Sequence, residues 1–224
     1  MGQAIGSLLP FAVGVTISPM PIVAMVLMLI TPKAKVNGFS FLAGWIIGVA
    51  AAGAVVLAIV GTAGATDDDE PANWTYWLKL VLGLALLVLA VRQWQHRPRA
   101  GADAPMPKWM SALDTFTPVK SAGLAFLLSA INPKNLIFIV GGATAVAQVG
   151  LSTGDEVVAW AVFTLIATIG VAIPMAIYLF LGERAGPLLD SLKTWMAQNN
   201  TVVLAVLILV IGVKLVGDAI AGLF

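Results

Sequence analysis

Six long runs of apolar residues constrain the fold of this chain more than any other feature of the sequence. A helix needs roughly 20 apolar residues to cross the hydrocarbon core of a bilayer, and each run reaches that length. Lipid offers no partner for backbone polar groups, so a helix, which satisfies them internally, is the expected form. The sequence therefore predicts an all-α membrane protein with six transmembrane helices. The runs cover residues 4–30, 37–62, 75–95, 121–149, 156–181 and 201–222.

The composition agrees with a membrane protein and argues against several kinds of chemistry. Apolar residues make up 60% of the 224 residues, charged residues make up 10%, and the mean hydropathy is +0.99. A soluble domain is far less apolar. Cysteine is absent and the single histidine, His96, lies in a basic segment, so neither a metal-ligand cluster nor a redox pair is expected. We therefore expect no enzyme activity, no cofactor and no bound metal.

Proline interrupts two of the six runs at a similar depth. A proline inside a helix removes a backbone donor and clashes with the preceding turn. Lipid cannot satisfy the carbonyls that such a break frees, so we expect both breaks to face one cavity near the midplane. Paired breaks in the two halves of a transporter point to its binding site. The candidate substrate-binding residues are Ser18, Pro19, Met20 and Pro21 in the first run, and Asn132, Pro133, Lys134 and Asn135 in the fourth.

The loops between the runs alternate in charge. The second and fourth loops carry acidic residues, whereas the first, third and fifth carry basic residues. Loops rich in Lys and Arg stay in the cytoplasm. We therefore expect a multi-pass protein of the cytoplasmic membrane with both termini extracytoplasmic. The basic loops hold nine of the twelve basic residues, namely Lys33, Lys35, Arg92, Arg97, Arg99, Lys108, Lys120, Arg184 and Lys193.

Three helices precede the long third loop and three follow it, so the two halves run in opposite directions across the membrane. This is the arrangement of an inverted repeat, with the first and fourth helices broken. Pro19 and Pro133 occupy corresponding places in the two halves, and the triplet around Gly83 is similar to the triplet around Gly212. The expected parts are a first three-helix repeat at 1–95, a cytoplasmic basic loop with an interfacial helix at 96–120, and a second, inverted three-helix repeat at 121–224.

Two segments outside the six runs have the pattern of short helices that lie in the cytoplasmic interface. Apolar residues recur at spacings of three and four in 106–116 and in 187–196, and prolines lie at the start of each segment. We expect both segments to anchor the protein at the membrane surface rather than to act as lipid-sensing gates.

The polar residues within the runs favour an anionic ligand. Lys134 places an ammonium group near the bilayer centre, where a charge is costly and marks a candidate functional site. No acidic residue lies near that depth, so a site for a cation or a free amine is not expected. The helix N-termini that follow Pro19 and Pro133 carry partial positive charge and attract anions. We therefore predict that Lys134 binds a carboxylate, phosphate or sulfate; the alternative is that it caps carbonyls freed by the break.

A second pair of charged residues lies in the last run. Lys214 and Asp218 are one helical turn apart, a spacing that favours a local ion pair. The alternative is that they couple transport to an ion gradient, and we retain both residues as coupling candidates.

The two breaks also give the chain a resemblance to known exporters. Asn132-Pro133-Lys134 in the fourth helix, Ser18-Pro19-Met20-Pro21 in the first, the helix count and the basic third loop resemble the lysine exporter (LysE) superfamily. Within it, the chain is most similar to the GAP, or Sap, branch of peptidoglycolipid-addressing proteins. That resemblance implies a membrane lipid or glycolipid as the substrate, the bacterial inner membrane as the location, and a homodimer as a possible assembly.

The leading hypothesis is an exporter or flippase that moves an anionic amphiphile across the membrane by alternating access. One alternative is an exporter of a small solute such as an amino acid or organic acid. Another is an accessory subunit that scaffolds a lipid-export complex. A lipid carrier should open sideways to the bilayer, whereas a solute carrier should enclose a water-filled pocket. Nucleic acid is not an expected partner.

Overall fold

The computed structural model describes residues 1–63, 73–95 and 116–223. The acidic segment at 67–70, His96 and nearly all of the predicted interfacial helix at 106–116 lie outside these residues. The described part is helical and contains no strand, so the all-α prediction is confirmed for it.

The helices follow the six apolar runs, and two of the runs are split as the prolines predict. The first run forms α1 and α2, which meet at a bend of 48°, and the fourth forms α5, η2 and α6, with a bend of 59° before α6. The segments in chain order are α1 (Gly2–Thr16), α2 (Pro19–Leu29), α3 (Ala34–Ala63), α4 (Asn73–Gln95), α5 (Pro118–Phe126), the π-helical η2 (Leu127–Ile131), α6 (Pro133–Ala147), α7 (Thr153–Leu181), the 3-10 turn η3 (Gly182–Arg184) and α8 (Ala185–Leu223).

The lengths and apolar character of these helices make this a membrane-embedded protein. Three helices, α3, α7 and α8, are each long and apolar enough to cross a bilayer, and the two bent pairs raise the number to five. The helix α4 covers the run at 75–95 but is not counted among these spans. The sixth span therefore stays a prediction.

Two helix boundaries differ from the sequence prediction. The helix α5 begins at Pro118, inside the segment expected to be loop, because Thr117 caps it and accepts a hydrogen bond from the Lys120 amide. The segment 187–196 is not a separate interfacial helix but the first part of α8. No proline or glycine separates the two parts, and Asn199 Nδ2 bonds back to the Trp195 carbonyl oxygen at 2.8 Å, within the helix.

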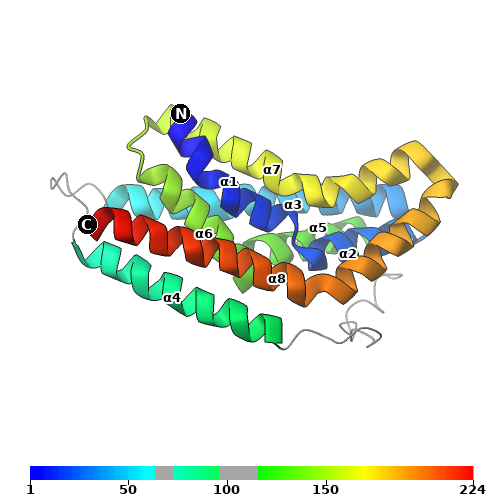
Figure 1. Ribbon diagram of the computed structural model, residues 1–224. Helices are drawn as coiled ribbons and strands as arrows, with labels where there is room; N and C mark the ends of the chain where they lie inside the picture. Colours follow the sequence, from blue (N-terminus) through cyan, green and yellow to red (C-terminus); the bar gives the residue numbers. More distant parts are fainter. Residues whose placement is uncertain (64–72, 96–115, 224) are drawn as a thin grey trace.

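The arrangement of the helices places both termini at the same end of the molecule (Figure 1). The helix α4 lies along α8 at the outside of the bundle, and the two run antiparallel. The two helices approach closely at two glycines: a β-carbon on Gly83 would lie 3.0 Å from the Gly212 carbonyl oxygen, and one on Gly212 would lie 3.1 Å from the Gly83 oxygen. Each glycine therefore packs against the carbonyl oxygen of the other, which lets the two helix backbones approach closely.

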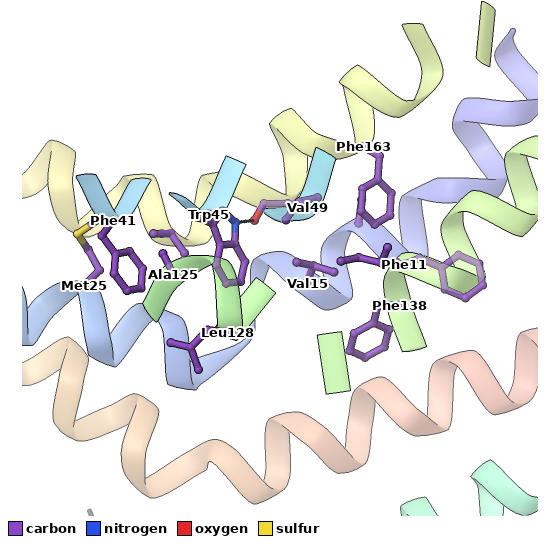
Figure 2. Packing of buried hydrophobic residues seen from close by; sticks show 14 of the residues in the cluster. Phe11, Val15, Met25, Phe41, Trp45, Val49, Ala125, Leu128, Phe138 and Phe163 are labelled. Carbon is purple, nitrogen blue, oxygen red and sulfur yellow. Dashed lines mark hydrogen bonds between the residues drawn. The ribbon is translucent and has the colours of Figure 1, made fainter. Parts of the chain in front are cut away.

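The helices α3 and α7 are joined by two reciprocal hydrogen bonds. Trp45 Nε1 on α3 donates to the Ala167 carbonyl oxygen on α7 at 3.2 Å (Figure 2), and Trp160 Nε1 on α7 donates to the Ala50 oxygen on α3 at 3.3 Å. Both indoles are buried, so each needs a partner for its N–H. The hydrogen bonds fix how these two helices face one another.

The core between α1 and α6 is built on two phenylalanine–glycine contacts. The Phe11 ring covers Gly141, and the Phe138 ring covers Gly14, so closely that neither glycine has room for a β-carbon. Both rings lie in the buried cluster (Figure 2). Because each helix gives a phenylalanine to the other and the contacts run in opposite order, α1 and α6 are antiparallel in a defined register.

Candidate functional site

The first break lies where α1 ends against α7. Thr16 Oγ1 donates to the Ala12 carbonyl oxygen at 2.9 Å and also lies 2.5 Å from the Ile166 carbonyl oxygen of α7. The Thr16 carbonyl packs on Gly170, where a β-carbon would overlap it. Ser18 then takes an extended backbone conformation and begins α2. The end of α1 is thus held at α7 before the chain turns.

At the second break, the two asparagines of the Asn-Pro-Lys-Asn segment bond to backbone groups on either side of Pro133. The chain widens into the π-helical turn Leu127–Ile131 before Pro133, whose missing N–H leaves a carbonyl of that turn without a donor. Asn135 Nδ2 replaces the missing donor, because it donates to the Leu128 oxygen at 2.7 Å. On the other side, Asn132 Oδ1 accepts from the Lys134 amide at 3.1 Å and caps α6.

The two breaks lie at the same level of the bundle. The Phe11–Gly141 and Gly14–Phe138 contacts set the antiparallel register of α1 and α6, so the end of α1 lies beside the first part of α6. The helix α2 also contacts the π-helical turn η2. Elements of the two halves of the sequence therefore meet near the breaks, and a shared substrate site at the two prolines stays a prediction.

Two side-chain oxygens at this level are buried without a hydrogen-bond partner. Ser18 is 1% exposed and Asn135 is 0% exposed, and neither Ser18 Oγ nor Asn135 Oδ1 has a partner among the described residues. A buried polar group normally has a partner, and one that lacks it indicates a ligand, a water or a functional constraint.

Lys134, which directly precedes Asn135, is partly buried. Its ammonium group makes no hydrogen bond or ion pair with any residue in the described ranges, whereas its backbone amide is the group that Asn132 caps. Asn135, not Lys134, satisfies the Leu128 carbonyl. The alternative role, capping of carbonyls freed by the break, therefore has no contact to support it.

The helix ends contribute less to an anion site than the sequence suggested. Pro19, Pro21 and Pro133 have no N–H, and the Lys134 amide is already bonded, so few backbone donors are left to a ligand. The two break prolines also differ, because Pro19 is buried while Pro133 is exposed. The positive charge that is available to an anion is mainly the ammonium of Lys134.

The coupling candidates lie at a different place. Lys214 Nζ and Asp218 Oδ2 form an ion pair of 2.6 Å, and the lysine also lies 5.8 Å from the centre of the Phe11 ring. Both line a cavity of about 360 Å³ at the end of the bundle that holds the termini. Gln3, Ser7 and Tyr76 line it too, and the sequence analysis did not single them out. The spacing of four between Gln3 and Ser7, polar residues on one face of an apolar helix, was the available signal.

The family model described as Sap, sulfolipid-1-addressing protein, matches residues 8–221 of this chain. The chain belongs to this Sap family. No curated protein and no solved structure matches it. The Sap match includes both breaks, Lys134, and the Lys214–Asp218 pair, and it confirms the resemblance to the Sap branch.

Proposed function

We propose that this Sap-family protein is a carrier of the bacterial inner membrane that moves an anionic amphiphile, a lipid or glycolipid, across the bilayer by alternating access. The observation that carries the proposal is the ammonium of Lys134, which has no partner in the described chain and lies at the level where two broken helices meet. The family's description, which concerns a sulfolipid, agrees with a lipid that bears a negative charge.

The electrostatics favour an anion over other ligands. A lysine at the centre of a bilayer costs at least about 2.5 kcal/mol on insertion scales. No acidic side chain of the two breaks offsets that cost. Asn132 and Asn135 each make a side-chain hydrogen bond to the backbone. An anionic headgroup that docks at Lys134 would supply the missing partner.

Alternating access fits a pseudo-two-fold arrangement of two inverted three-helix repeats. The reciprocal indole hydrogen bonds of Trp45 and Trp160 and the glycine contact between Gly83 and Gly212 join corresponding helices of the two halves, as such an axis would require. Six spans, α4 included, and extracytoplasmic termini are consistent with both ends of the chain lying together (Figure 1). We further propose that the protein has no enzymatic activity and that, if it forms a homodimer, each subunit keeps its own site.

The test is flipping of fluorescent lipids in vesicles that contain the purified protein. Lys134→Met should abolish flipping of an anionic lipid while the protein stays folded, and Lys134→Arg should impair it in part, because a planar guanidinium does not replace a point charge in a confined site. Lys193→Met is the matched control, because this lysine also lies in a helix but is already paired with Asp190.

Three results would each count against the proposal. If Lys134→Met flips the lipid as well as the parent does, the lysine is structural. If the parent flips no lipid but transports an organic acid, the protein is a solute exporter. If it does neither while co-purifying with a lipid exporter, the scaffold hypothesis is correct.

A further inference from the structure

The second break determines which hydrogen bonds Asn135 can offer to a ligand. A carboxamide has one end that donates and one that accepts. The donating Nδ2 is bonded to the Leu128 carbonyl oxygen at 2.7 Å, and the opposite orientation would place two oxygens against each other. Of the two ends, Oδ1 is the one without any partner among the described residues, and an oxygen of this kind can only accept. The sequence predicted Asn135 as a substrate-binding residue without a hydrogen-bond direction, and the structure leaves its acceptor oxygen unsatisfied.

Ser18 presents the second unsatisfied group at the same level. Its hydroxyl can donate and accept, and it has no partner among the described residues. Within those residues the buried side-chain atoms without a partner are Ser18 Oγ, Asn135 Oδ1 and Asn37 Oδ1, so two of the three belong to the two breaks. This coincidence ties the unsatisfied atoms to the site rather than to the core in general.

The free acceptor and the free ammonium place different demands on one ligand. An anionic group satisfies Lys134 but repels Asn135 Oδ1. A cationic group would satisfy Oδ1 but would lie near the ammonium of Lys134. A neutral donor beside an anionic group meets both demands.

We propose that the headgroup carried at the breaks brings a neutral hydrogen-bond donor, a hydroxyl or an amide N–H, next to its anionic group. The inference rests on the proposed function. The anion binds Lys134, the neutral donor bonds to Asn135 Oδ1, and the Ser18 hydroxyl bonds to the same part of the headgroup. In the arrangement described here both oxygens are fully buried and unsatisfied, which is unfavourable, so a headgroup with a donor favours the open, loaded form.

The experiment compares two lipids of equal charge in the reconstituted protein. Fluorescent phosphatidylglycerol carries hydroxyl donors beside its phosphate, and fluorescent phosphatidylmethanol carries none. The parent should flip phosphatidylglycerol roughly tenfold faster, because a polar site rejects a ligand that leaves its groups unpaired. Free sn-glycerol 3-phosphate inside the vesicles shows whether the donor and the anion are enough without the lipid chains.

Ser18→Ala and Ser121→Ala are the matched variants. Both serines are buried, but Ser121 Oγ is bonded to the Thr117 carbonyl oxygen at 3.1 Å, whereas Ser18 Oγ is unsatisfied. Ser18→Ala should keep or raise the Tm and should shrink the preference for phosphatidylglycerol several-fold. Ser121→Ala should lower the Tm slightly and leave the preference unchanged.

Each outcome separates the inference from the function on which it rests. Equal flipping of the two lipids by the parent, still lost in Lys134→Met, overturns the donor requirement and leaves the carrier intact. A preference that Ser18→Ala does not change also overturns it. Inhibition of lipid flipping by sn-glycerol 3-phosphate supports the donor requirement and indicates that a free solute can meet it. Flipping of neither lipid refutes the proposed lipid carrier itself.

Discussion

Trp45 and Trp160 make reciprocal hydrogen bonds, each from its indole Nε1 to a carbonyl oxygen of the other's helix, at 3.2 and 3.3 Å. The donors lie on α3 and α7, the second helix of each predicted repeat. Reciprocal contacts between corresponding helices of the two halves agree with an inverted repeat, which stays a prediction.

Replacing either indole by phenylalanine should destabilise the protein by a similar amount. Each change removes one buried hydrogen bond and part of a ring, which together cost about 1–3 kcal/mol in the free energy of unfolding. Trp77→Phe is the control, because Trp77 is 56% exposed and should change stability little. Thermal unfolding in detergent is the measurement, and a loss for one of the two buried indoles alone would argue against equivalent repeats.

Two glycine substitutions should act in opposite directions. In Gly170→Ala the new methyl group meets the Thr16 carbonyl oxygen, so the α1–α7 contact opens and stability falls by about 1–3 kcal/mol. In Gly217→Ala nothing lies near the new methyl group, and the better helix former raises stability by up to about 1 kcal/mol. Chemical unfolding in mild detergent checks both signs. A neutral Gly170→Ala would show that the two helices are not held closely at the break.

Pro133→Ala should straighten the fourth span. The alanine restores an N–H that can bond a carbonyl of the π-helical turn, and Asn135 then loses its role at Leu128. Spin labels at the exposed positions Gly123 and Val140 should move apart, since the chain contains no cysteine that interferes with labelling. Flipping should fall several-fold. Pro10→Ala, inside the continuous helix α1, is the control. It should leave the distance between the labels at Gly123 and Val140 unchanged.

The orientation can be read from single cysteines in intact cells. We expect Asp68→Cys to react with an impermeant maleimide and Arg99→Cys to be protected, because the basic loops are predicted to be cytoplasmic. Detergent permeabilisation should expose both positions equally. Labelling of position 99 alone would invert the proposed topology.

The sequence predicted the breaks at Pro19 and Pro133 but not how their polar atoms are satisfied. A proline acts through its own covalent structure, so its effect on a helix is local and can be read residue by residue. The orientation of the Asn135 side-chain amide depends instead on the π-helical turn at Leu128. No periodicity in the sequence predicts that turn. For this reason the sequence named Asn135 as a substrate-binding candidate but not the direction of its hydrogen bonds.

By itself the sequence determined that this is a helical membrane protein with two broken spans, because the length of an apolar run and the chemistry of proline act within one segment. Only the tertiary structure decided that the end of α1 lies beside the first part of α6, that Lys134 has no partner among the described residues and that Lys214 belongs to a separate cavity. These facts depend on the register between helices. Register is set by close contacts such as Phe11 on Gly141, and apolar helices of similar composition can pack in many registers until such contacts choose one.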